Sequence, residues 1–294
     1  MKKTNISALL LAALLLIQLL CAPVSAVTAE PAADAPADAQ TASDDSAGDA
    51  AAEADSVPED QLLSSREQFS VAAKAALLID LNTNRVVYEQ DADERVYPAS
   101  LTKIMTCLIA LENGNLSDVV TVSESALADL DEDSSVAGLV VGEQMTLENL
   151  LYCMMVVSGN DACNVIAEHV AGSVTDFVRM MNQRAYELGC TNTHFNNPHG
   201  LHDESHYTTA RDLAIITQAA LKSENFRQIV DTYEYKLPDD NMRQNIPKLK
   251  TTNMLIYQSM SNSLYYPRAH GIKTGYTTPA GRCVISAAKS DGMY

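Results

Sequence analysis

A serine and a lysine lie three positions apart, Ser100 and Lys103, at the head of an apolar run. At a helix start, residues i and i+3 share a face, so the hydroxyl and the ammonium become neighbours. A serine hydroxyl is a weak nucleophile until a base takes its proton, and lysine can be that base when burial or another cation lowers its pKa. The helix start also favours a developing oxyanion near the Ser100 backbone N–H. The pair therefore indicates covalent serine chemistry.

The same spacing recurs at Ser286 and Lys289, so spacing alone is weak evidence. This second pair falls in a strand-like run, where residues i and i+3 point to opposite faces of a sheet. We therefore expect the chemistry at Ser100 and none at Ser286.

Ser158-Gly159-Asn160 is a second candidate group, between two expected helices. On a tight turn the hydroxyl can relay protons and the carboxamide can bind a peptide carbonyl. Capping of the following helix by Asn160 is the alternative interpretation. The pattern also recurs at Ser223-Glu224-Asn225, so it is weak by itself.

Lys273, Thr274 and Gly275 form a third group in a strand-like run. A second lysine beside Lys103 would supply the positive charge that keeps Lys103 neutral, and it would attract a substrate carboxylate. Gly275 would let a ligand backbone approach the strand closely.

The elements expected around these groups predict an α+β domain. Two β-rich runs, 75–81 and 85–89, flank an Asn-containing turn, and 271–277 with 283–288 predict a second hairpin. Helical patterns lie between the hairpins, at residues 100–111, 146–157, 160–171, 175–188 and 209–221. Strands at both ends with helices between them predict an antiparallel sheet made from N- and C-terminal segments, with a helical subdomain.

Composition divides the chain into three segments. Residues 1–26 have a basic start, a short apolar stretch and small residues at a cleavage position, which predicts a signal peptide; an uncleaved membrane anchor is the alternative. Residues 27–68 hold 11 acidic residues and one basic residue, and we expect a disordered acidic tether. Residues 69–294 remain as the folded domain.

Charge and cysteine content exclude several function classes. The net charge is −18 and basic clusters are lacking, which argues against nucleic-acid binding. No spacing typical of metal ligands occurs, so we expect no metal and no cofactor. The odd number of cysteines after residue 26 cannot all pair within one chain, and we expect most of them to be buried small hydrophobic residues. They are Cys107, Cys153, Cys163, Cys190 and Cys283.

Together the three groups form a set, S-x-x-K, S-x-N and K-T-G, that is typical of β-lactamases and penicillin-binding proteins. From about residue 75 the chain resembles the low-molecular-mass penicillin-binding proteins, the serine-type D-alanyl-D-alanine carboxypeptidases of peptidase family S11. The resemblance rests on YPASLTKIMT (97–106), VSGNDA (157–162), NPHGL (197–201), HYTTARD (206–212) and GIKTGYT (271–277). It implies a β-lactamase/transpeptidase-like fold.

The resemblance also implies roles for single residues. Ser100 would attack the penultimate D-Ala carbonyl of a peptidoglycan stem peptide, with Lys103 as base, and water would then hydrolyse the acyl-enzyme. Ser158 and Lys273 would relay the proton to the leaving amine, and β-lactams would acylate Ser100. An oxyanion hole would use the N–H groups of Ser100 and Tyr276. The substrate-binding residues it implies are Asn160, Thr274, Gly275 and Tyr276.

The family resemblance implies an exported enzyme at the cell wall or at the outer face of the cytoplasmic membrane, where it trims donors for cross-linking. Such enzymes continue with a further strand and helix, and then usually a β domain and a membrane-binding tail. We therefore expect the catalytic domain at 69–294 to be incomplete at its C-terminus, with part of the sheet truncated and any membrane anchor missing.

Three alternatives stay open. A class A β-lactamase shares the motifs, but it needs a glutamate-bearing loop where this chain has Asn197-Pro198-His199-Gly200-Leu201. A D,D-endopeptidase has the same motifs, and a non-catalytic wall-binding relative could keep the fold. His199 is expected to be structural, because a Ser/Lys mechanism does not require it.

Overall fold

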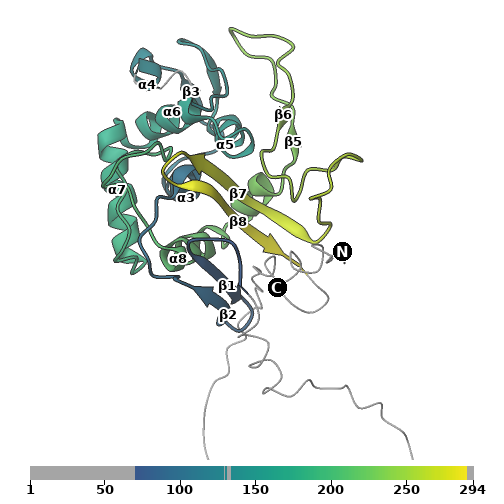
Figure 1. Ribbon diagram of the computed structural model, residues 1–294. Coiled ribbons are helices and arrows are strands. Elements are labelled where there is room, and N and C mark those ends of the chain that lie inside the picture. Colours follow the sequence, from purple (N-terminus) through teal and green to yellow (C-terminus); the bar gives the residue numbers. More distant parts are fainter. Residues whose placement is uncertain (1–69, 129, 131–133, 290–294) are drawn as a thin grey trace, which may run out of the picture. The chain divides into compact units, whose positions relative to one another are not determined.

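The computed structural model describes residues 70–128, 130 and 134–289 (Figure 1). The signal peptide and the acidic tether expected at residues 1–26 and 27–68 lie outside the described residues. In the part of the chain that the structure describes, no helix is long and apolar enough to cross a membrane.

The N-terminal hairpin is confirmed. Strands β1 (Ala76–Asp80) and β2 (Arg85–Gln90) pair antiparallel, with a register shift at Leu78/Ile79. The Asp80 carboxylate accepts hydrogen bonds from the backbone N–H groups of Asn82 (2.9 Å) and Thr83 (3.3 Å), and Asn84 closes the turn with a φ of 55°. Asparagine tolerates this left-handed conformation, which explains the sequence of the turn.

The C-terminal hairpin is also confirmed, with β7 (Ala269–Thr277) paired antiparallel to β8 (Gly281–Ala288). Both hairpins confirm the α+β class. Within the described residues, however, β1–β2 and β7–β8 form separate two-stranded ladders instead of one sheet built from both ends of the chain. Each hairpin is closed by its own short turn, so its strands pair with their neighbours in sequence.

The structure confirms the five expected helices. Apolar periodicity and cap residues both indicate where these helices lie. Thr146, Ser173 and Thr209 each accept a hydrogen bond from the backbone N–H three residues later, which satisfies a free donor at the helix start. A 3-10 turn, η1 (Ala99–Thr102), precedes the first helix. The helices are α3 (Lys103–Asn113), α5 (Leu147–Val156), α6 (Asn160–Ala171), α7 (Val174–Glu187) and α8 (Ala210–Ala220).

Six shorter elements carry no clear signal in the sequence. The serine of Ser223-Glu224-Asn225, which repeats the S-x-N pattern, caps one of them through the Phe226 backbone N–H. The pairs β3–β4 and β5–β6 are antiparallel. These elements are β3 (Val119–Thr121), α4 (Glu124–Ala128), β4 (Gln144–Thr146), α9 (Glu224–Val230), β5 (Glu234–Tyr235) and β6 (Leu249–Lys250).

Helix α3 runs through the hydrophobic core and packs against α5, α6, α7, α8 and α9 (Figure 1). Its side chains from Lys103 to Ala110 are all buried. Because η1 packs against β7, the start of α3 is held between the helices and the C-terminal hairpin. The fold thus fixes residues 100–103 on both sides.

The cysteines in the described part of the chain are free thiols, as expected from their number and surroundings. Four are buried, and Cys283 is half-buried. Burial raises the pKa of Cys163 and of Cys190 to about 12, which keeps both thiols protonated near neutral pH.

Candidate active site

Ser100 lies in η1, directly before α3 begins. The residue ahead of it, Ala99, has a φ of 49°, a left-handed conformation that costs a non-glycine residue about 1–3 kcal/mol. The turn is closed by a hydrogen bond from the Leu101 N–H to the Pro98 carbonyl (3.1 Å). This turn presents the Ser100 hydroxyl on the face of Lys103.

The Lys103 ammonium joins three segments of the chain. Its Nζ donates to Ser100 Oγ (3.0 Å), to Asn160 Oδ1 (2.7 Å) and to the His199 carbonyl oxygen (2.8 Å). The side chain is 0% exposed, and burial lowers the pKa of Lys103 against the opposing effect of Cys163 and Asp161. A buried amine with a lowered pKa, within hydrogen-bond reach of a serine hydroxyl, can accept the serine proton.

Lys273, on β7, is the second buried lysine and is 1% exposed. Its Nζ donates to the Thr274 carbonyl oxygen (2.9 Å). Burial, and then the charge of Lys103, lower the pKa of Lys273 to about 7. The charge of Lys103 thus disfavours protonation of Lys273. The reverse effect, in which Lys273 keeps Lys103 neutral, stays a prediction from the sequence, because burial is the cause that lowers the pKa of Lys103.

Ser158 and Asn160 lie at the turn between α5 and α6. Ser158 is buried, and its backbone has the left-handed conformation, with a φ of 63°. Gly159 is the N-cap of α6, and the Asn160 side chain makes no capping hydrogen bond. Instead, Asn160 Oδ1 accepts from Lys103, so the helix-capping alternative does not describe this asparagine.

Strand β7 passes directly against the serine turn at Gly275. A Cβ on Gly275 would lie 3.0 Å from Ser100 N and 3.2 Å from Ala99 Cβ, so a side chain there would push the strand away. The next residues differ in surroundings: Thr274 Oγ1 lies 2.6 Å from Thr252 Oγ1, and Tyr276 is exposed. Gly275 therefore allows the close approach of β7 to Ser100.

The backbone of residues 197–201 forms part of this site, which the residue types alone did not reveal. The Pro198 carbonyl accepts from Thr106 Oγ1 (2.6 Å), next to the contact between the His199 carbonyl and Lys103. Gly200 has a φ of +93°, and a Cβ there would lie 1.9 Å from the Ala99 carbonyl oxygen. Only glycine fits between this segment and the serine turn.

The His199 imidazole itself contacts local backbone, with Nδ1 accepting from the Leu201 N–H (3.2 Å). Burial, and then the Lys103 charge, lower the pKa of His199 to about 3, so the ring is neutral near pH 7. The part of His199 that reaches the site is its carbonyl group.

A second buried histidine holds the serine turn from the opposite end. His206 Nδ1 accepts from the Asn196 N–H (3.1 Å), and Nε2 lies 2.9 Å from Thr102 Oγ1. Burial lowers the pKa of His206 to about 4, so the ring is neutral and Nε2–H donates to Thr102. This contact explains why the 206–212 segment belongs with the serine turn.

The structure thus joins Ser100, Lys103 and Asn160 by hydrogen bonds, and it brings Lys273 and Gly275 beside them. Within the described ranges, no group of three or more His, Cys, Asp or Glu side chains could hold a metal ion. The contact between Ser100 and Lys103 can support attack by the serine hydroxyl, with transfer of its proton to the buried amine.

Comparisons with known proteins identify a family and several relatives for this chain. A family model described as Peptidase_S11, D-alanyl-D-alanine carboxypeptidase, matches residues 62–294. The D-alanyl-D-alanine carboxypeptidase DacF of Bacillus subtilis is 41% identical over 75% of this chain and 55% of its own length. DacA of Haemophilus influenzae is 36% identical over 76% of this chain and 55% of its own length. The chain thus spans about half the length of these curated relatives.

Two solved structures share the fold. The Streptomyces K15 DD-transpeptidase is 32% identical, with a TM-score of 0.68 over 76% of this chain and 87% of that one. Penicillin binding protein 5 from Haemophilus influenzae is 33% identical, with a TM-score of 0.67 over 76% of this chain and 63% of that one. These similarities confirm the β-lactamase/transpeptidase-like fold.

Proposed function

This chain belongs to the peptidase S11 family of D-alanyl-D-alanine carboxypeptidases, and on that premise we propose that it removes the terminal D-Ala from peptidoglycan stem peptides. The observation that carries the proposal is the contact between the buried Lys103 amine and the Ser100 hydroxyl, 3.0 Å apart. A stem peptide ending in D-Ala-D-Ala would be the substrate, and β-lactams would be covalent inhibitors.

The proposed reaction begins with neutral Lys103. As Ser100 Oγ attacks the penultimate D-Ala carbonyl carbon, Lys103 takes the hydroxyl proton, and a tetrahedral oxyanion forms between the N–H groups of Ser100 and Tyr276. The C–N bond then breaks, and the proton reaches the leaving amine through Ser158 and Lys273. Free D-Ala departs and leaves an ester on Ser100. Water hydrolyses this ester, with its proton passing to Lys103 and back to Ser100 Oγ.

Substrate binding is proposed for the groups around this centre. Asn160, held by Lys103, would bind the peptide backbone, and Gly275 would let that backbone approach β7. Thr274 would bind the terminal carboxylate, which the positive charge shared by Lys103 and Lys273 attracts. These roles are supported by the closeness of the groups to Ser100 and by the family.

The cellular context is also a proposal. Residues 69–294 would form the catalytic domain, exported by a signal at residues 1–26 and spaced from it by the acidic segment 27–68. The exported enzyme would act at the cell wall. The signal, the tether and any membrane anchor stay predictions from the sequence.

The proposed activity is tested by measuring D-Ala release from a peptide that ends in D-Ala-D-Ala. We expect release by the unmodified protein and none by Ser100→Ala, with a peptide ending in L-Ala as the substrate control. Release that persists in Ser100→Ala would contradict the assignment of the nucleophile.

The alternatives give different outcomes in two further assays. Rapid turnover of nitrocefin, in place of stoichiometric acylation, would favour a β-lactamase. Cleavage of cross-linked muropeptides without release of D-Ala would favour an endopeptidase. Absence of both D-Ala release and a penicillin adduct would favour a non-catalytic relative.

A further inference from the structure

The turn that carries Ser158 and Asn160 is hydrogen-bonded to residues 134–142, called here the support loop. The Asn160 N–H donates to the Ser135 carbonyl oxygen (2.8 Å). The buried Asp161 carboxylate accepts from three successive N–H groups of the support loop, those of Ala137 (2.8 Å), Gly138 (2.9 Å) and Leu139 (3.0 Å). The support loop therefore bears directly on the second group of site residues.

The closeness of this packing explains Gly159. A Cβ on Gly159 would lie 2.8 Å from Asp161 Oδ1 and 3.1 Å from both Cβ and N of Ala137. A side chain at this position would force the support loop away from the turn. The positions of Ser158 and Asn160 thus depend on where the support loop lies.

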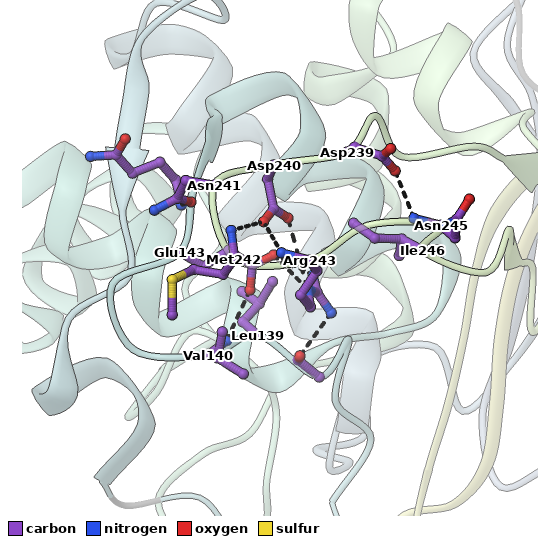
Figure 2. Close-up of polar contacts among 12 residues, drawn as sticks. Leu139, Val140, Glu143, Asp239, Asp240, Asn241, Met242, Arg243, Asn245 and Ile246 are labelled. Carbon is purple, nitrogen blue, oxygen red and sulfur yellow. Dashed lines mark hydrogen bonds and ion pairs between the residues drawn. The ribbon is translucent and has the colours of Figure 1, made fainter.

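The far side of the support loop is held by Arg243 (Figure 2). Its Nη1 donates to the Gly138 carbonyl oxygen (2.9 Å), and its Nε donates to Glu143 Oε1 (2.8 Å), which Nη2 also contacts. The other Glu143 oxygen accepts from the Val140 N–H (2.9 Å). We call Arg243, Glu143 and Gly138 the Arg243 clamp.

The Arg243 clamp is held by further hydrogen bonds. Asp240 Oδ1 accepts from the Arg243 N–H (2.7 Å), which fixes the backbone that carries the guanidinium (Figure 2). Beside it, the Asn241 side chain donates to the Gly142 carbonyl oxygen (2.9 Å) and accepts from the Gln144 N–H (2.7 Å). A second segment of the chain is thus tied to the middle and to the C-terminal end of the support loop.

This arrangement of acceptors requires an arginine. Glu143 is 0% exposed, so its charge needs a partner inside the protein. The planar guanidinium offers donors in two directions, one to a carboxylate and another to a carbonyl oxygen. A lysine offers a point charge on a flexible stem and cannot hold both acceptors in the same fixed geometry.

Gly138 connects the clamp to the site through its two peptide groups. Its carbonyl accepts from Arg243 and its N–H donates to Asp161, whose neighbour Asn160 accepts from Lys103. We propose that Arg243 is a positioning residue for acylation, which acts through Gly138 and Asp161 to fix Ser158 and Asn160 relative to Lys103. The inference rests on the proposed function, because acylation of Ser100 is its readout.

The test compares Arg243→Lys, Asp161→Asn and the double variant with the unmodified chain, using the rate of acylation by a fluorescent penicillin. Each single change should slow acylation about tenfold, since small displacements of positioned groups are costly. Because both residues act along one path, the double variant should be about as slow as the slower single variant. Melting temperatures are measured on the same samples.

Arg211→Lys is the matched control. Arg211 also bridges two carboxylates, with Nε 2.7 Å from Asp93 and Nη2 2.7 Å from Glu89, but it links α8 to the N-terminal hairpin. It should lose stability as Arg243→Lys does and acylate at the unmodified rate. If Arg243→Lys does not fold, Glu143→Gln removes the charge partner and should slow acylation in the same way.

Two outcomes would contradict the positioning role of Arg243. One is acylation of the Arg243 variant at the rate of the Arg211 control. The other is a double variant in which the two losses of acylation rate are independent and additive. Either would leave the clamp as a stabilising contact only. If the unmodified protein is not acylated, the proposed function is wrong, and the proposed role of the Arg243 clamp is then wrong as well.

Discussion

Two segments of this chain share the pattern S-x-x-K, and the fold gives them different surroundings. Ser100 and Lys103 stand one turn apart where η1 meets α3, and their side chains are hydrogen-bonded at 3.0 Å. Ser286 lies in β8 and donates to the Gly271 carbonyl oxygen (2.9 Å), while Lys289 follows the strand and is exposed.

The difference shows that the secondary-structure element, more than the spacing, decides whether the serine and the lysine side chains meet. A helix start brings residues i and i+3 together and points backbone N–H groups at the same place, whereas a strand separates them. Burial adds what spacing cannot supply, because enclosure lowers the pKa of Lys103.

Replacing each serine gives the sharpest contrast. Ser100→Ala removes the nucleophile, so intact mass spectrometry after benzylpenicillin should show no adduct. Ser286→Ala removes only a hydrogen bond in the hairpin, so the adduct should form in full. An adduct that is lost in Ser286→Ala and kept in Ser100→Ala would reverse the comparison.

Replacing each lysine should give the next largest effect. Lys103→Met fills the same space without a base, and acylation should slow by about 10²- to 10⁴-fold, the usual contribution of a positioned base. Lys289→Met should acylate at the unmodified rate. The measurement is the second-order rate constant with a fluorescent penicillin, and equal rates in both variants would refute the role of Lys103.

Two glycines of the C-terminal hairpin test how β7 supports the first segment. Gly275→Ala should slow acylation about tenfold, because its Cβ would lie 3.0 Å from Ser100 N and displace the strand. Gly281→Ala is the control, since a Cβ there meets nothing within 4 Å. Its φ of +70° should cost stability of about 1 kcal/mol and leave acylation unchanged. Equal acylation rates in both would contradict the proposed contact.

A smaller effect is expected in the pH dependence of stability. The pKa of Lys273 is lowered to about 7 in the folded protein, so between pH 7 and pH 9 the unfolded chain binds more protons at this position. This contribution to the unfolding free energy therefore rises with pH, by at most about 1.4 kcal/mol per pH unit.

Lys273→Met removes that contribution. The stability advantage of the variant over the unmodified chain should be greatest near pH 7 and should shrink toward pH 9, as measured by urea unfolding. A constant difference across this range would show that burial does not lower the pKa of Lys273.

Much of the fold could be predicted because long helices combine periodicity with caps. Thr146 and Thr209 mark helix starts that the structure confirms to within one residue. The short elements, such as the two-residue strands β5 and β6, have too few residues to show a period. Both strands lie against α5, so tertiary contacts determine them more than local pattern does.

The candidate site likewise has one part that could be predicted from the sequence and one part that could not. Side chains with distinctive chemistry, such as Lys103, Asn160 and Lys273, could be selected from the sequence, and the structure brings them together. The contributions of the His199 carbonyl and of Arg243 could not be foreseen. A backbone carbonyl has no signature in residue type, and a clamp between segments about 100 positions apart depends on tertiary folding.

The contacts of Lys103 also determine when, during synthesis of the chain, this residue can be enclosed. Its partners Asn160 and His199 lie 57 and 96 residues downstream, and Lys273 lies further still. During synthesis a growing chain emerges N-terminus first, so Ser100 leaves the ribosome long before the groups that enclose Lys103. Before Asn160 and His199 have been made, Lys103 lacks two of its three hydrogen-bond partners, and we expect its amine to keep the pKa of an exposed lysine. We therefore expect the Ser100 hydroxyl to stay unactivated during synthesis until these downstream segments have folded around Lys103.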